Sequence, residues 1–147
     1  MENAGRNLAE MAIECLATNW RQARIVVLAG PGGNGGGGIA AARHLANHGA
    51  HVELCLAGPD KLGEIPAWQY RVFHSTDGKE VSPRELNKES VDVILDALIG
   101  YGLQSVPQDI FVDLIGWANA SRIARGRLLG AQPARSPLSV FNCLRDG

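Results

Sequence analysis

The apolar residues of this chain follow two different spacings in its first third. Near the start they recur at helical intervals, which predicts a helix from Asn3 to about Arg21. The residues that define this pattern are Leu8, Met11, Ala12, Cys15 and Leu16. Residues 25–29 (IVVLA) then form a short, unbroken apolar run. Runs of this kind are typical of strands buried on both faces, as in parallel sheets.

A helical pattern rich in alanine follows from Ile39 to Asn47, and Gly49 stands where a helix C-cap glycine is expected. Residues 51–57 (HVELCLA) predict a second strand, closed by a Gly-Pro pair. A strand, a glycine-rich segment from Gly30 to Gly38, a helix and a second strand together predict a βαβ unit.

The next part of the chain is less regular. Residues 67–73 are compatible with a helix, and residues 83–88 with a turn or a helix start. Residues 91–98 (VDVILDAL) predict a third strand that ends at Asp96, and residues 108–120 predict an amphipathic helix. Its apolar side consists of Ile110, Phe111, Leu114, Ile115 and Trp117. Strands that alternate with helices predict an α/β sandwich around a mostly parallel sheet.

The character of the chain changes after Ser121. Residues 122–147 are rich in Arg, Gly, Pro and Ser, and they show no clean period where the next strand of the sheet is expected. Residues 1–121 carry a net charge of −5 (9 Lys+Arg, 14 Asp+Glu), whereas residues 122–147 carry +4 (5 Arg, 1 Asp). We therefore interpret 1–121 as a domain that is incomplete at its C-terminal side, and 122–147 as an irregular basic tail.

Composition limits the class of protein. The 147 residues are 46% hydrophobic and 20% charged, with a net charge of −1, which is ordinary for a soluble globular domain. This balance argues against nucleic acid or an anionic membrane as the main partner. The three cysteines match no metal or redox spacing, and no run approaches the roughly 18–20 apolar residues of a membrane span. These features predict a cytoplasmic protein.

Glycine occupies seven of the nine positions from Gly30 to Gly38. A turn between a strand and a helix presents backbone N–H groups at the positive end of the helix dipole, and glycine lets phosphate oxygens approach them. No lysine is present for a P-loop, and the G-x-G-x-x-G pattern through Gly30, Gly32 and Gly35 lacks an acid at the end of the second strand. The segment predicts a phosphate or nucleotide cradle; a flexible connector is the alternative.

Asn34 and Asp96 are candidate ligands of a hard cation, because amide and carboxylate oxygens suit such ions. Each follows or ends a predicted parallel strand, so the two side chains are expected to share one crevice. The alternatives are local: asparagine tolerates left-handed turn geometry, and an acid near a strand end often accepts a turn or cap hydrogen bond.

Three segments together resemble the NAD(P)H-hydrate epimerases, the YjeF N-terminal domain family. They are MENAGRNLAEMA at the start, VVLAGPGGNGGGGIAAARHLANHG from Val26, and DVILDALIGYGL from Asp92. The resemblance implies a Rossmann-like three-layer fold. It also implies interconversion of the R and S forms of hydrated NADH and NADPH beside a potassium ion.

The resemblance also implies a set of site residues. Asn34 and Asp96 fall on the family's potassium ligands. Two segments fall on its substrate-binding turns: Gly33, Asn34, Gly35, Gly36 and Gly37, and then Gly100, Tyr101, Gly102, Leu103, Gln104, Ser105 and Val106. The family habit further implies a homodimer.

The chain departs from the family pattern at three places. Gly33 and Gly37 stand where the family usually has Asn and Asp, and the tail lacks the Asp-x-Pro-Ser-Gly motif that carries the favoured acid–base residue. The tail is interpreted as a shifted reading frame or as a genuine divergent form. The catalytic residue therefore stays unassigned. His44 and His48 are i, i+4 candidates for a metal pair or a substitute acid–base group, against the alternative of solvated helix positions.

Two functions follow from these observations. The first is an epimerase-type isomerase that is impaired in this chain. The second is a non-catalytic nucleotide-binding or protein-interaction module on the same fold.

Overall fold

One parallel sheet organises the molecule. The computed structural model describes residues 1–86, 91–100, 109–123 and 127–130. Within this part, five strands stand in the order β3-β2-β1-β4-β5, and every neighbouring pair is parallel. The strands are β1 (Arg24–Ala29), β2 (His51–Leu56), β3 (Lys79–Glu80), β4 (Val93–Ala97) and β5 (Arg127–Gly130). The predicted α/β fold with a parallel sheet is confirmed.

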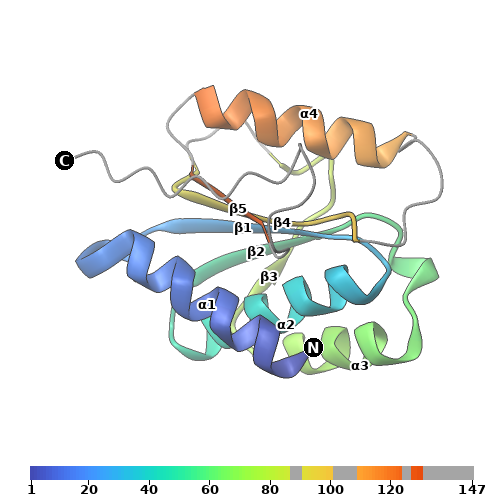
Figure 1. Ribbon diagram of the computed structural model, residues 1–147, viewed down its shortest axis with the longest axis horizontal. Helices are drawn as coiled ribbons and strands as arrows, with labels where there is room; N and C mark the ends of the chain where they lie inside the picture. Colours follow the sequence, from blue (N-terminus) through green and yellow to red (C-terminus); the bar gives the residue numbers. More distant parts are fainter. Residues whose placement is uncertain (87–90, 101–108, 124–126, 131–147) are drawn as a thin grey trace.

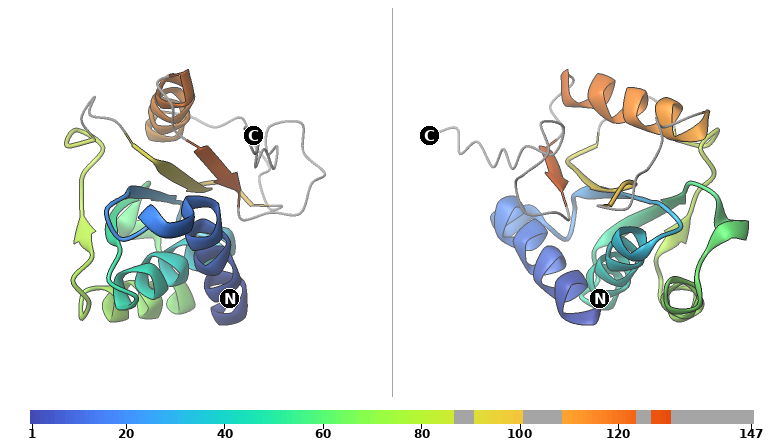
Figure 2. Two further views of the ribbon diagram at one scale, coloured as in Figure 1. Left: turned by 90° about the vertical axis from the view of Figure 1, so that its left-hand side faces the viewer. Right: turned by 45° about the vertical axis from the view of Figure 1, so that its right-hand side comes forward.

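Helices cover both faces of this sheet and complete three layers. Figure 1 shows α1, α2 and α3 on one face and α4 on the other, and the two views of Figure 2 agree. The helices are α1 (Glu2–Leu16), α2 (Gly33–Asn47), α3 (Glu64–Phe73) and α4 (Ile110–Ile123), with short 3₁₀ turns at Ala17–Asn19 and Pro59–Lys61. Among the described residues, no helix is long and apolar enough to cross a membrane.

The central strand β1 is buried on both sides, as its unbroken apolar run predicts. Successive side chains of a strand point to opposite faces. Ile25, Val27 and Ala29 therefore join the core beneath α1 and α2, whereas Val26 and Leu28 join the core beneath α4. All five are fully buried. Because both faces of β1 are buried, its register relative to the neighbouring strands is fixed. The fixed register determines the position of the carboxyl end of β1 in the sheet.

Helix α2 begins at Gly33, so the prediction of a loop through Gly38 followed by a helix from Ile39 is wrong from Gly33 onward. Five glycines lie in its first six residues. Each costs about 0.8–1.0 kcal/mol relative to alanine in a helix interior, so together they disfavour this half of the helix by roughly 4–5 kcal/mol. The low helix propensity of glycine is the reason why the sequence pattern did not predict this half of the helix. Tertiary packing provides the stability that the glycines themselves do not.

That packing is close because glycine has no side chain. A Cβ atom placed at Gly38 would lie 2.5 Å from the Cβ of Ala97 in β4, and one placed at Gly5 would lie 2.5 Å from the Cβ of Ala40. The glycines thus let α2 approach the sheet on one side and α1 on the other. Glycines that disfavour an isolated helix therefore allow close packing where two elements of the fold meet.

Three further predictions meet different outcomes. The helix predicted near residues 67–73 is α3, and the face predicted for residues 108–120 is the face of α4 that packs on the sheet. Strand β3 was not predicted. The prediction of irregular structure after Ser121 is wrong for β5, whose four residues pair in parallel with β4, and for the last residues of α4. The division at residue 121 stays a prediction.

Strand β5 escaped prediction for a physical reason. Its sequence RLLG contains no β-branched residue and is too short to show a period. Its pairing comes instead from the backbone groups that β4 presents along its open edge, in register from Val93 opposite Arg127 to Asp96 opposite Gly130. Backbone pairing of this kind depends on the neighbouring strand and leaves little trace in the side chains.

Candidate functional site

The carboxyl ends of β1 and β4 lie side by side. Leu28 pairs with Asp96 and Ala29 with Ala97. Directly after β1, the backbone N–H of Gly30 donates to the carbonyl oxygen of Ala97 at 3.1 Å. The glycine segment and the end of β4 therefore meet at one edge of the sheet, where open α/β sheets bind their ligands.

The first turn of α2 presents its backbone N–H groups at this edge. Gly32 is the N-cap residue and makes no side-chain capping hydrogen bond, and the helical ladder begins with Gly36 N–H donating to the Gly32 carbonyl at 2.9 Å. The N–H groups before Gly36 have no partner within the helix. Together with the helix dipole, they form the kind of arrangement that binds phosphate.

Two of the glycines are required by close backbone contacts. A Cβ atom at Gly35 would overlap the carbonyl oxygen of Gly30, and a Cβ atom at Gly30 would overlap the carbonyl oxygen of Leu98. The turn therefore folds back on itself and against the end of β4. Gly33 and Gly37 differ: among the described residues, no atom lies within 4 Å of a Cβ placed at either position.

Asn34 lies inside the first turn of α2 and not in left-handed turn geometry, since the positive-φ non-glycine residues of the described chain are Ala17 and Asp109. Its side-chain Nδ2 donates to the carbonyl oxygen of Ile99 at 3.0 Å. This bond joins the start of α2 to the segment that follows β4. It also fixes the orientation of the amide, whose oxygen is then directed away from Ile99.

Asp96 is the partly buried carboxylate at the end of β4. Its Oδ1 accepts a hydrogen bond from the backbone N–H of Leu98 at 3.1 Å. Burial raises the pKa of this carboxyl group, and the hydrogen bond from Leu98 opposes that shift in part. A desolvated carboxylate gains from a nearby cation, because the cation restores the charge balance that water no longer supplies.

Several predicted site residues fall beyond this geometry. Gly100 is the last described residue before the gap at 101–108, so Tyr101, Gly102, Leu103, Gln104, Ser105 and Val106 lie outside the described residues. Within the described part, no group of three or more His, Cys, Asp or Glu side chains is arranged to hold a metal ion. The pair formed by Asn34 and Asp96 stays a prediction.

His44 in α2 and His48, which caps the C-terminal end of that helix, each contact a protein group. His44 Nε2 lies 2.7 Å from a carboxylate oxygen of Glu2, and His48 Nδ1 lies 2.7 Å from the carbonyl oxygen of His44. These contacts favour structural positions over the metal pair or acid–base substitute that their spacing allows.

Sequence reasoning missed two features of this region. The carbonyl oxygen of Ile99 is an acceptor for Asn34, and Glu2 connects three helices. The first is a backbone contact between residues 65 positions apart, and no sequence signal marks it. The second lies in the MENAG segment, which the resemblance singled out without a role.

A cavity of about 340 Å³ lies at the opposite, amino end of the sheet. Its lining includes the first residues of β1, β2 and β3, namely Arg24, His51 and Lys79, together with Glu53 and Asp77. Arg24 and Glu53 form an ion pair of 2.7 Å. The cavity is thus lined by charges of both signs, two of which already form an ion pair, and it lies away from the glycine turn. We place the candidate site at the carboxyl end.

Comparison with known proteins connects this geometry to a family. Residues 1–131 match the model of the YjeF-related protein N-terminus. The chain is 47% identical over 120 residues to an NAD(P)H-hydrate epimerase of Dehalogenimonas lykanthroporepellens, a match that covers 82% of the chain and 49% of the relative. It is 36% identical over 130 residues to the bifunctional NAD(P)H-hydrate repair enzyme Nnr of Hyperthermus butylicus, covering 82% and 23% respectively.

The fold agrees with these matches. The crystal structure of the yeast protein ynu0 (YNL200c) superposes with a TM-score of 0.74 at 19% identity, and the match covers 90% of this chain and 58% of the yeast chain. The match to this chain spans about half the length of the Dehalogenimonas epimerase and about a quarter of the longer Hyperthermus enzyme. With its parallel sheet, its glycine turn and a family match over nearly nine tenths of its length, this chain belongs to the YjeF-related N-terminal domain family.

Proposed function

We propose that this chain is the nucleotide-binding part of an NAD(P)H-hydrate epimerase, which interconverts the R and S forms of hydrated NADH and NADPH. The observation that carries the proposal is the meeting of two segments at one edge. The uncapped N–H groups of α2, the Asn34 amide and the Asp96 carboxylate all come from the adjoining ends of β1 and β4. The names of the matched relatives point the same way.

In this proposal the first turn of α2, from Gly33 to Gly37, binds the phosphates of the hydrated dinucleotide through backbone N–H groups. The segment from Gly100 to Val106, which follows β4 in the sequence, contributes further substrate-binding residues in this proposal. Hydrogen bonds from a preorganised turn orient the nucleotide without ordering any side chain, because glycine has none to order.

The donor set at this edge fits a potassium ion. Asn34 and Asp96 supply hard oxygen atoms, and Asp96 is partly buried, which raises its pKa and disfavours its charge unless a cation lies nearby. When bound, the ion supplies positive charge beside the phosphates. Asn34 would hold it through its amide oxygen, while its Nδ2 remains bonded to Ile99. Asp96 would hold it through the carboxylate oxygen that does not accept from Leu98.

Epimerisation also requires proton transfer at the hydrated nicotinamide, and the chain has no Asp-x-Pro-Ser-Gly motif to provide it. A positioned acid–base group contributes about 10²–10⁴ in rate, so we propose slow turnover for this chain alone. A non-catalytic binding or interaction module is the less favoured alternative, since the matched relatives bear the names of enzymes. Cytoplasmic location and homodimer formation stay predictions.

The test couples epimerisation to a second enzyme. The R epimer is incubated with the purified chain, potassium and a dehydratase specific for the S epimer, and the recovery of NADH is followed by absorbance. Recovery faster than spontaneous epimerisation, and lost with Asp96→Ala, supports the epimerase. Measurable dinucleotide binding without acceleration supports the non-catalytic module. Absence of both contradicts the proposal.

A further inference from the structure

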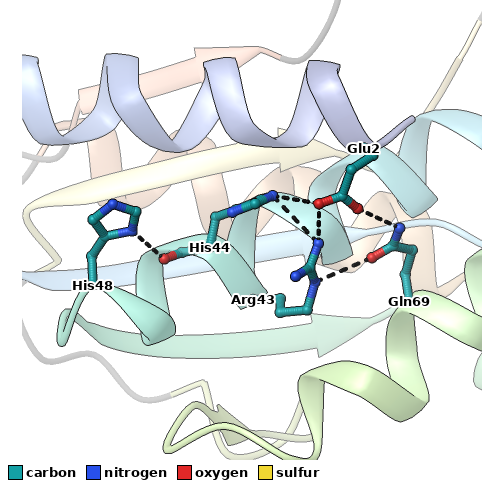
Figure 3. A network of polar contacts seen from close by, with 5 residues as sticks. All are labelled: Glu2, Arg43, His44, His48 and Gln69. Atoms are coloured by element: carbon teal, nitrogen blue, oxygen red, sulfur yellow. Dashed lines mark hydrogen bonds and ion pairs between the residues drawn. The ribbon is translucent and has the colours of Figure 1, made fainter.

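Glu2 joins three helices through one carboxylate. It lies in the first turn of α1 and accepts a hydrogen bond from Gln69 Nε2 of α3 at 2.9 Å. The same carboxylate contacts Arg43 and His44 of α2, and Figure 3 shows the four side chains converging. The hydrogen bonds from Gln69 and Arg43 lower the pKa of Glu2 to about 2, so it is charged at neutral pH.

Gln69 closes this arrangement into a ring. Gln69 as a whole residue is only 2% exposed, and both polar atoms of its amide make hydrogen bonds within the ring. Nε2 donates to Glu2, and Oε1 accepts from Arg43 Nε at 3.3 Å. A buried amide is stable only where its hydrogen bonds are made, so α3 is held where Glu2 and Arg43 can reach it.

Met1 and Pro66, which are neighbours of ring residues in the sequence, lie against the first turn of α2. A Cβ atom placed at Gly36 would lie 2.5 Å from Met1 Sδ and 3.1 Å from Pro66 Cγ. Met1 directly precedes Glu2, and Pro66 lies one helical turn before Gln69 on α3. The ring therefore holds the start of α1 and α3 together where Met1 and Pro66 both face the Cα of Gly36, within the first turn of α2.

We propose that Glu2 is a positioning residue, which keeps the glycine-rich first turn of α2 in the helical geometry that aims its N–H groups at phosphate. The turn needs such support because five glycines in six residues give it little helical preference of its own. The ligand part of this inference rests on the proposed function. The positioning part rests on the ring and on the contacts of Met1 and Pro66 with Gly36.

The first measurement needs no ligand. Amide hydrogen exchange of the segment 33–38 is followed by mass spectrometry in the wild-type chain and in Glu2→Gln, which keeps the shape of the side chain and removes its charge. Glu10→Gln is the matched control, because Glu10 is exposed on the same helix and has no ion pair among the described residues. Exchange of 33–38 is expected to rise about fivefold in Glu2→Gln and to stay unchanged in the control.

A second variant approaches the ring from α3. Gln69→Met keeps the length of the side chain and removes both hydrogen bonds, and it is expected to raise exchange in the same segment. Peptides covering β1 serve as the internal reference. A rise spread evenly over the whole chain would show a general loss of stability and overturn the proposal, as would unchanged exchange in 33–38.

The second measurement uses ADP as the probe of the phosphate site. Calorimetry is expected to show about fivefold weaker ADP binding in Glu2→Gln than in Glu10→Gln. Equal affinities would contradict the ligand part of the inference. If wild-type protein binds no ADP while exchange of 33–38 still responds to Glu2→Gln, the proposed function fails and the positioning role of Glu2 stands.

Discussion

The two ends of the parallel sheet are built in opposite ways. At the carboxyl end, glycines bring backbone groups together, and the partly buried carboxylate of Asp96 has no cationic partner among the described residues. At the amino end, a cavity is lined by larger charged side chains; the Arg24 guanidinium forms an ion pair with Glu53, and the Arg24 backbone N–H donates to the Asp92 carboxylate. The first turn of α2 offers N–H groups that have no partner within the helix, whereas Arg24 at the amino end already contacts two carboxylates of the protein.

This difference between the two ends of the sheet indicates which end is the better candidate for ligand binding. The amino end has the cavity, but Arg24 and Glu53 in its lining already form an ion pair, so a ligand that binds either of them would have to compete with that pair. The carboxyl end has N–H groups at a helix start that have no partner within the helix, and Gly32 provides no side-chain cap. Unsatisfied groups of known direction identify a ligand site better than empty volume does.

Substitution within the glycine turn is expected to have the largest effect. Gly35→Ala places a methyl group on the carbonyl oxygen of Gly30 and should lower the free energy of unfolding by about 2–3 kcal/mol, since backbone must move to relieve the overlap. Gly37→Ala is the control: it meets no described neighbour and should stabilise the helix by about 0.5–1 kcal/mol. Urea denaturation measures both, and equal effects would contradict the close contact at Gly35.

Restoring the family's polar residues should sharpen the contrast between the two ends. Gly33→Asn and Gly37→Asp add side chains where the described structure leaves room. Each new hydrogen bond to the nucleotide contributes about 0.5–1.5 kcal/mol, so the double variant should bind a dinucleotide roughly tenfold to a hundredfold more tightly. Calorimetric titration checks this, and unchanged affinity would show that the turn does not face the nucleotide.

Asp96 provides a test by pH. Its pKa is raised by burial, so the protonated form stabilises the fold below the unfolded pKa, and that contribution is lost as pH rises through the folded pKa. In thermal unfolding at pH 7 without potassium, the midpoint of Asp96→Asn should therefore lie about 2–5 °C above that of wild type. This corresponds to a free energy of unfolding that is larger by roughly 1 kcal/mol. The difference should vanish at acid pH.

Potassium gives the same variant a second measurement. Addition of the ion should raise the unfolding temperature of wild type and leave Asp96→Asn unchanged. Sodium at equal ionic strength separates a bound ion from general screening. A variant that responds to potassium as wild type does would remove Asp96 from the cation site.

The amino end should give the smallest effects. Glu53→Gln removes the partly exposed ion pair with Arg24 and should destabilise the chain by about 0.5–1 kcal/mol, with a smaller loss at high salt. Dinucleotide affinity should not change, because this pair lies at the far end of the sheet. A loss of affinity in Glu53→Gln would place the site at the amino end and reverse the comparison.

The sequence by itself determined the strands that are buried on both faces and the residues that end them. An apolar run such as that of β1 has one stable environment, between two layers of helices, and this is enough to predict a parallel sheet. Asn34 and Asp96 could be proposed as neighbours because Asn34 follows the carboxyl end of one strand and Asp96 lies at the carboxyl end of another. The amphipathic face of α4 was evident for the same reason, since burial of apolar area leaves a period in the sequence.

Only the tertiary structure decided where α2 begins, that β5 pairs with β4, and that Glu2 meets Arg43 and Gln69. In each case the stabilising partner is a backbone group or a side chain far away in the sequence. Glycine is a poor helix former alone, yet it is well suited to a helix pressed between α1 and the sheet. The local sequence pattern reflects the secondary-structure preference of each residue, whereas contacts between distant residues decide where the fold departs from that preference.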